Sequence, residues 1–208
     1  GQAGATVHVA APKSRMRPDS IRAWDKTDWG KSVAVDLDVE AVDAEDYDAL
    51  VLPGGQINPD KLRLELKALA AIRAFLSSGK PVAAICHAPW LLIEAGAAKG
   101  LKMTSYASIR TDVRNAGAEW QDAEVVTDRG IITSRNPGDL DAFCAKIIEE
   151  IKEGRHEPRR LAEALAEIGP DISQALIFAT AFPYGPAFAD KIAKDELKID
   201  DVVDVGGV

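Results

Sequence analysis

The sequence predicts an α/β fold in which helices cover a mostly parallel β-sheet, and three segments carry this prediction. Residues 49–52 (ALVL) and 81–86 (PVAAIC) are short apolar runs, which are typical of strands buried on both faces of a parallel sheet. Between them, residues 60–78 repeat an apolar residue every three or four positions, as one face of a helix does. The apolar residues are Leu62, Leu66, Leu69, Ile72 and Leu76. Alternation of strand and helix indicates a sheet covered by helices in a sandwich.

The chain before these segments is less regular. Residues 5–10 form a short β-type run, and residues 33–37 alternate in polarity. The stretch between them, residues 11–32, is polar and is interrupted by Pro12 and Pro18. We therefore expect a strand, a long irregular excursion and then an edge strand.

Strands and helices continue to alternate after the second apolar run. Residues 88–95 predict a helix, and residues 101–106 predict a strand followed by a short helix that ends at Asn115. Residues 124–127 and 131–133 predict two strands around an Asp-Arg-Gly turn.

The sequence predicts one more helix of this domain, which ends near Glu153. It begins at Asn136-Pro137, where Asn suits the N-cap and Pro suits the first turn. Its expected core face consists of Leu140, Phe143, Cys144, Ile147, Ile148 and Ile151. We therefore interpret Cys144 as a buried and unreactive thiol.

The composition narrows the class of protein. A chain of 208 residues that is 47% hydrophobic can bury one well-formed core. Its 25 basic and 33 acidic residues give a net charge of −8, so we expect no nucleic-acid partner. No apolar run is long enough to cross a bilayer, so we expect no membrane partner. Two cysteines do not form a disulfide framework and indicate a reducing, cytoplasmic setting. We expect no cofactor and no metal ion.

Cys86 is the most informative residue, because it lies where an apolar strand meets a helix. Ligands of α/β proteins gather at the carboxyl ends of parallel strands. A thiol on such a turn lies beside free backbone N–H groups, which lower its pKa and can also hold a developing oxyanion. The alternative is a buried, inert cysteine, and the position before His87 and a helix favours the reactive one.

Two neighbouring features bear on this turn. His87 follows the cysteine directly, although adjacent side chains on a turn can point apart. Pro53-Gly54-Gly55 follows another predicted strand, and glycines there allow a backbone to approach a ligand closely. The glycine turn is either a plain tight turn or a second part of the same site.

Several motifs, in order and spacing, resemble the branch of the DJ-one/PfpI superfamily that contains PfpI-type intracellular proteases, general stress proteins and deglycases. They are DALVLPGG (48–55), PDKLRLELKAL (59–69), GKPVAAICHAPWLLIEAG (79–96), TSYASIRTDVRNAGAEW (104–120) and ITSRNPGDL (132–140). The resemblance covers about residues 1–152. It implies a flavodoxin-like three-layer sandwich that works as a homo-oligomer, either a dimer or a larger ring.

The resemblance also implies roles for individual residues. Cys86 is the expected nucleophile, and His87 its partner. Asp60 matches an acidic residue that reaches the histidine of a neighbouring subunit. The backbone N–H groups of Gly55 and His87 are the expected oxyanion donors.

Two further residues lie at the ends of motif segments. Tyr106 and Arg135 are weaker candidates for lining a substrate pocket. For Arg135, a surface or interface ion pair is an equally good interpretation. Ala88 stands where the family usually has glycine, which is tolerable if the backbone there is helical.

The family's first strand, with a glutamate that hydrogen-bonds the cysteine, has no counterpart before residue 5. We divide the chain into a PfpI-like domain, residues 1–153, and a C-terminal extension, residues 154–208. Residues 175–180, the loop 181–186 and a following helix have the order of a first strand, loop and helix. Either this unit replaces the first strand, as in a circular permutation, or it is an unrelated extension. The loop contains no carboxylate in either case.

Two functions agree with these residues. The first is a cysteine-dependent stress-response enzyme, a peptidase, glyoxalase or deglycase, in which the thiolate adds to a carbonyl of small carbonyl compounds, glycated amines or peptides. The second is a non-catalytic stress protein in which Cys86 is an oxidation sensor. Asp60, His87 and Gly55 favour the enzyme, whereas the absence of the glutamate favours the sensor.

Overall fold

The computed structural model describes residues 3–15, 17–25 and 28–157, and a four-stranded sheet lies at the centre of this part of the chain. The strand order is β5 (Leu50–Leu52), β6 (Val82–Ile85), β10 (Ile131–Ser134) and β9 (Val125–Asp128). The first three strands are parallel, and β9 pairs with β10 in the antiparallel direction. The predicted α/β fold with a mostly parallel sheet is therefore confirmed.

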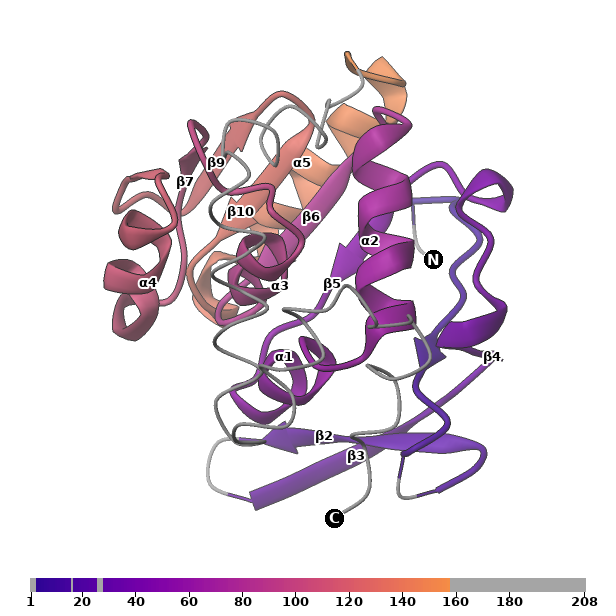
Figure 1. The fold of residues 1–208 in the computed structure, drawn as a ribbon. Coiled ribbons are helices and arrows are strands. Elements are labelled where there is room, and N and C mark those ends of the chain that lie inside the picture. The colour runs from indigo at the N-terminus through magenta and orange to yellow at the C-terminus, as the bar shows by residue number, and fades with distance from the viewer. Residues whose placement is uncertain (1–2, 16, 26–27, 158–208) are drawn as a thin grey trace, which may run out of the picture. The chain divides into compact units, whose positions relative to one another are not determined.

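Helices cover both faces of this sheet, which gives three layers (Figure 1). Along β6, Val82 and Ala84 join one apolar cluster, together with residues of α2 (Leu66–Ser77) and α3 (Pro89–Glu94). The alternate residues Ala83 and Ile85 join a second cluster with Phe143 of α5 (Leu140–Glu153). The period of two along a strand thus assigns each residue to one of the two faces.

Three small sheets surround the central one. Strands β1 (Ala10–Ala11) and β4 (Leu37–Asp38) are parallel, as are β7 (Lys102–Met103) and β8 (Glu119–Trp120). Strands β2 (Ser20–Asp25) and β3 (Asp28–Ala34) form an antiparallel hairpin. Short helical turns connect the strands; they are η1 (Val39–Ala41), η2 (Ala44–Asp46), η3 (Ala107–Ile109), α4 (Arg110–Asn115) and η4 (Pro137–Asp139).

The hairpin corrects two predictions. We expected an irregular excursion over residues 11–32 and an edge strand over residues 33–37, but β2 and β3 occupy most of the first range. A strand is recognised mainly from one apolar face, and these two strands are largely polar and exposed. Their pairing also shifts register between Arg22 and Trp24, which disturbs the alternation.

The single helix predicted over residues 60–78 is two helices, α1 (Ile57–Leu62) and α2. The chain between them turns back on itself, and Glu65 adopts an extended conformation. Because the apolar spacing of three or four residues holds on both sides of this break, the sequence pattern does not reveal it. Of the predicted face, Leu69, Ile72 and Leu76 are buried, whereas Leu66 is exposed.

Helix α5 ends at Glu153 as predicted, and the side chain of Asn136 accepts a hydrogen bond from the Gly138 N–H, 2.8 Å away. Its buried face differs from the prediction, however. Phe143 is buried and Ile147 packs partly against it, whereas Cys144 is exposed. Leu140 and Ile151 are exposed as well. The expectation that Cys144 is a buried thiol is therefore wrong, because one helix packing on a sheet buries a narrower stripe than its apolar residues span.

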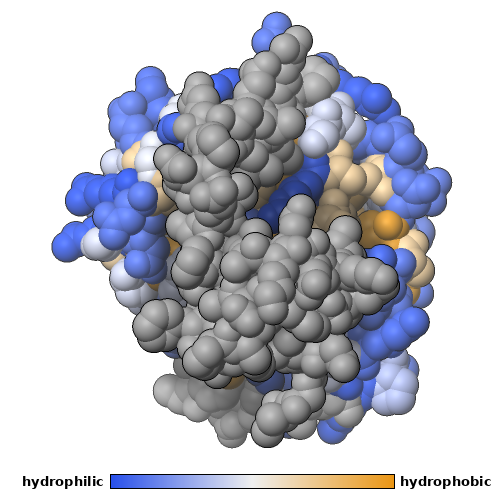
Figure 2. Space-filling view, in the orientation of Figure 1, coloured by the Kyte–Doolittle hydropathy of each residue, from blue (hydrophilic) through white to orange (hydrophobic). Residues whose placement is uncertain are grey.

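The described surface is mainly hydrophilic on the face that Figure 2 shows, with a few hydrophobic residues on the right of that view. No helix among the described residues is both long and apolar enough to span a bilayer. The described strands give β5 one partner only, β6. The strand and helix predicted within residues 175–197 lie outside the described residues, so their proposed place in the sheet stays a prediction.

The core can be tested with one substitution and a matched control. Leu92 of α3 is fully buried, so Leu92→Ala should lower the free energy of unfolding by about 2–5 kcal/mol. Val7→Ala, at a valine that is 66% exposed, should change it by less than about 0.5 kcal/mol. Urea unfolding followed by circular dichroism measures both values. Equal losses for the two variants would contradict this placement of the core.

Candidate active site

Cys86 leaves β6 in a backbone conformation that is unusual for a residue with a side chain. Its φ is +66°, in the left-handed region. Two backbone hydrogen bonds hold it there. The Cys86 N–H donates to the Ser134 carbonyl of β10 at 2.9 Å, and the Cys86 carbonyl accepts from the Tyr106 N–H at 2.9 Å. The turn is therefore fixed on one side by the sheet and on the other by the segment before η3.

His87 points its ring back toward the cysteine. The Cys86 Sγ lies 3.2 Å from Nδ1 of His87, and the opposite ring nitrogen, Nε2, lies 3.1 Å from the Ser108 hydroxyl. The ring stacks on Tyr106 with centroids 4.9 Å apart, and it meets Trp90 edge-on with centroids 5.4 Å apart. This arrangement suits an imidazole that accepts the thiol proton at Nδ1 and donates Nε2–H to Ser108.

The glycine turn after β5 lies against the cysteine. A Cβ atom on Gly54 would be 2.6 Å from the Cys86 Cβ and 2.8 Å from the Ile85 carbonyl oxygen, so only glycine fits there. Gly55 has a φ of +80°, which also favours glycine. The backbone N–H groups of Gly55 and His87 both act on the Cys86 sulfur. The turn is thus part of the site, and the two predicted oxyanion donors lie at the same atom.

The electrostatics of the pair differ from our expectation. Burial raises the pKa of the Cys86 thiol, and the N–H groups of His87 and Gly55 oppose this effect only in part. Burial also lowers the pKa of His87. The predicted fall in the thiol pKa is therefore wrong. Helix α3 has only six residues, and the desolvation of a thiolate outweighs what its first turn contributes. Burial therefore disfavours the charged form of both groups.

A cavity of about 320 Å³ lies on the other side of Tyr106, and neither Cys86 nor His87 lines it. It is lined by Ser105, Tyr106, Ala107, Trp120, Asp122, Arg135 and Asn136. Tyr106 therefore connects the cavity wall with the His87 ring. Arg135 forms ion pairs with Asp139 at 2.9 Å and with Asp122 at 2.8 Å. The hydrogen bond with Asp139 is the largest cause of a raised pKa of Arg135, and the hydrogen bond with Asp122 is the next. Both interpretations of Arg135 hold in part, since it lines the cavity and is ion-paired.

Asp60 stands apart from this group within one chain. It lies in α1, is exposed, and forms no hydrogen bond or ion pair with another described residue. No carboxylate of the described residues contacts the Cys86 sulfur either. Sequence reasoning missed Ser108, which anchors the far side of the His87 ring. Ser108 follows Cys86 by 22 positions in the sequence, so only the fold brings its hydroxyl next to the His87 ring.

The comparisons with known proteins agree with this geometry. The family model described as DJ-1/PfpI family matches residues 1–150. The chain belongs to the DJ-1/PfpI family. "Deglycase PfpI" of Pyrococcus furiosus is 50% identical over 123 residues, which are 59% of this chain and 74% of that protein.

Two further relatives of this family broaden the comparison. "General stress protein 18" of Bacillus subtilis is 47% identical over 112 residues, 53% of this chain and 64% of that protein. The crystal structure of Drosophila melanogaster DJ-1beta is similar with a TM-score of 0.54 and 31% identity, covering 66% of this chain and 72% of that one. The resemblance seen in the sequence motifs is thus confirmed.

The one departure within the family motif is accommodated. Ala88, in place of the usual glycine, has φ −59° and ψ −25°, which is helical backbone open to any residue. Its side chain is fully buried in the apolar cluster above β6. Alanine therefore leaves the turn intact.

The protonation of the pair can be measured directly. Because burial raises the pKa of Cys86, its alkylation by iodoacetamide should rise with a midpoint above that of free cysteine, about 8.5. Mass spectrometry of the peptide that contains Cys86 separates this signal from that of the exposed Cys144. A midpoint below that of free cysteine would mean that the amides outweigh the burial.

Proposed function

We propose that this protein is a cysteine-dependent enzyme of the PfpI type, in which Cys86 adds to a carbonyl group and His87 is its base. The observation that carries the proposal is the 3.2 Å contact between Sγ and Nδ1 at a turn whose backbone N–H groups face the same sulfur. A nucleophile, a base and two donors at one atom meet the requirements of acyl-type chemistry. Ser108 is a positioning residue, because it acts only through the His87 ring.

The proposed step begins from the uncharged thiol and the uncharged imidazole. Sγ forms a bond to the carbonyl carbon while the thiol proton passes to Nδ1 of His87, and the electron pair of the C=O bond moves to the oxygen. The N–H groups of Gly55 and His87 stabilise the resulting oxyanion. With an aldehyde, the imidazolium returns its proton to this oxygen and a thiohemiacetal results. With an amide, the oxyanion re-forms the C=O bond as the C–N bond breaks, and the amine leaves with the proton from the imidazolium. Water then hydrolyses the thioester left on Cys86, which releases the acid and restores the thiol.

The proposed substrates are small carbonyl compounds, glycated amines and peptides. Deglycase PfpI of P. furiosus is named for the removal of glycation, and the identity of 50% supports the same class here. A cavity of about 320 Å³ beside Tyr106 suits a small substrate or one side chain of a larger one. We do not propose nucleic acid as a partner, because the chain has an excess of acidic residues. We also propose a cytoplasmic location, because both cysteines are free thiols.

An oxidation sensor is the weaker alternative. Oxidation by peroxide requires the thiolate, and a sensor cysteine has a low pKa. The burial that raises the pKa of Cys86 therefore works against a sensor. An enzyme tolerates the same pKa, because His87 removes the proton during attack.

We propose further that the enzyme is a homo-oligomer in which Asp60 approaches His87 of a neighbouring subunit. Three large apolar side chains in and after α1 support an interface here; Ile57, Leu64 and Leu66 are 54%, 80% and 78% exposed. Grouped exposed apolar residues mark protein–protein contacts. An acid that arrives from a partner would orient the imidazole, which no carboxylate of the described residues does within one chain.

Replacement of the nucleophile tests the enzyme proposal. Cys86→Ser should reduce methylglyoxal consumption to the background rate, because a serine hydroxyl beside a neutral imidazole is a much weaker nucleophile. Cys144→Ser is the matched control and should keep full activity, because its thiol is exposed on α5. Turnover at the parental rate by a folded Cys86→Ser protein would contradict the proposal.

Replacement of the acid tests the proposed role of the partner subunit. Asp60→Ala should lower turnover by up to about 100-fold, because a misoriented base attacks poorly. Size-exclusion chromatography should show that the variant assembles like the parent. Asp141→Ala, at another exposed carboxylate in the first turn of a helix, is the control and should be silent. Unchanged turnover in an assembled Asp60→Ala protein would remove Asp60 from the mechanism.

A further inference from the structure

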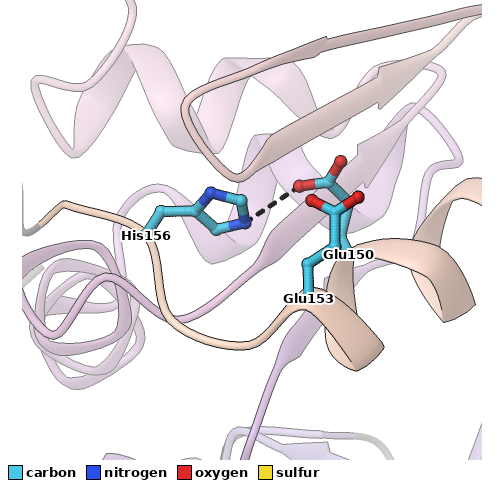
Figure 3. Close-up of side chains that lie close together, drawn as sticks. All are labelled: Glu150, Glu153 and His156. Atoms are coloured by element: carbon cyan, nitrogen blue, oxygen red, sulfur yellow. Dashed lines mark ion pairs between the residues drawn. The ribbon is translucent and has the colours of Figure 1, made fainter.

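Three ligating side chains converge at the end of α5, far along the chain from the cysteine turn (Figure 3). Glu150 and Glu153 lie one turn apart on the helix, and Gly154, with a φ of +91°, ends it. The chain then brings His156 back toward both carboxylates. One ligand atom from each side chain lies within 4.8 Å of the other two. We call these three residues the Glu-Glu-His cluster.

Part of the cluster is buried and lacks hydrogen-bond partners. The side chain of Glu150 is only 4% exposed. Its Oε2 and the Nε2 of His156 are both shielded from solvent, and neither makes a hydrogen bond. The two atoms lie 2.9 Å apart, as the dashed line in Figure 3 marks, but not in the alignment of an N–H donor and its acceptor. Apart from this ion pair the two buried atoms have no hydrogen-bond partner, and a bound ion is one explanation for such atoms.

The surrounding backbone holds the histidine in this place. The His156 N–H donates to the Gly79 carbonyl at 2.7 Å, and its ring packs directly on Gly130 in the turn between β9 and β10. A side chain at position 130 would collide with the ring. On the other side, Lys146 pairs with Oε1 of Glu150 at 3.1 Å and leaves Oε2 to face the histidine. Both buried ligand atoms are thus oriented before any ion arrives.

We propose that the Glu-Glu-His cluster binds a divalent transition-metal ion of the zinc class. One imidazole nitrogen and two carboxylate oxygens are ligands that Zn²⁺ accepts, whereas Ca²⁺ and Mg²⁺ prefer oxygen alone. Lys146 and a divalent ion would together carry three positive charges, which match the three carboxylates Glu149, Glu150 and Glu153. Three protein ligands leave one coordination position for water. This departs from the expectation, drawn from the sequence, that the chain binds no metal ion.

The position of the cluster assigns the ion a structural role. Gly79 and Gly130 precede β6 and β10, so the cluster lies at the amino ends of the parallel strands, and Cys86 lies at their carboxyl ends. A metal ion here would tie the end of α5 to the turns that begin two central strands. It would not reach the reacting thiol.

Zinc titration of the full chain tests this proposal. The parent for the test carries Cys86→Ser and Cys144→Ser, so that no thiol competes for the metal. The chain has three histidines, and the other two are His8 and His87, outside the cluster. After removal of metal with a chelator, isothermal titration with Zn²⁺ should show one site per chain. Addition of Zn²⁺ should also raise the melting temperature.

Variants locate the site. Loss of a residue that merely supports a ligand weakens metal binding by about 10- to 100-fold, so loss of a direct ligand in Glu153→Gln should cost at least as much. Glu153 is exposed, so this variant should fold like the parent. Glu157→Gln, a nearby exposed carboxylate outside the cluster, is the matched control and should bind as tightly as the parent. His156→Gln should also weaken binding.

A spectrum separates this site from binding elsewhere. With Co²⁺ in the protein that keeps both cysteines, a metal at the Glu-Glu-His cluster should give visible bands without a thiolate-to-cobalt charge-transfer band. The proposal is overturned if Zn²⁺ does not bind, or if Glu153→Gln and His156→Gln both bind like the parent. Either result would leave an ordinary ion pair between Glu150 and His156.

Discussion

Cys86 turns out of β6 with a φ of +66°, a conformation that costs a residue with a side chain on the order of 1–3 kcal/mol. Contacts with neighbouring residues hold the Cys86 backbone in this conformation. Strand β10 accepts its N–H through Ser134, and Tyr106 donates to its carbonyl. Gly54 leaves the space that the displaced Cβ needs. Each element of the site is positioned by this one turn, because the turn aims the sulfur out of the sheet and brings His87 beside it.

The same turn explains why the charged form of the thiol is disfavoured. It places the sulfur against the backbone N–H groups of Gly55 and His87, but it also buries the sulfur partly among Ile85, the glycines and the second apolar cluster. Desolvation is the larger of the two effects on the thiol pKa. The N–H groups therefore stabilise charge best when it moves to a substrate oxygen during attack. In the proposed mechanism, His87 supplies the base at that moment, and Ser108 and Tyr106 keep its ring in place.

The sequence predicted those features that depend on local pattern. Strands β5, β6, β9 and β10 are short apolar segments bounded by turn residues, and the structure places each within one residue of the prediction. Helix α5 ends at Glu153 as predicted but begins at Leu140, after the short turn η4. The hairpin β2–β3 was missed because its register shift disturbs the alternation, and the break before α2 was missed because the apolar spacing continues across it. The direction of the Cys86 pKa was wrong because it depends on burial, which is a property of the packed fold. Ser108 and the Glu-Glu-His cluster were missed because a turn of the chain, not sequence spacing, brings their members together.

The two ends of the parallel strands show how the fold separates stability from chemistry. At the carboxyl ends, Gly54 is required because Cys86 packs on its backbone; at the amino ends, Gly130 is required because His156 does. In both contacts a polar side chain packs over a glycine. Cys86 has its partner, His87, in the same turn, whereas His156 pairs with Glu150 of α5. His156 is held by Gly79 and faces a buried carboxylate oxygen that has no hydrogen bond. Lys146 pairs with the other oxygen of Glu150, so this buried carboxylate already has one cationic partner. Burial of a carboxylate is costly unless its charge is compensated, and the proposed metal ion would add to that compensation while also using Glu153 and the observed convergence of the three ligand atoms.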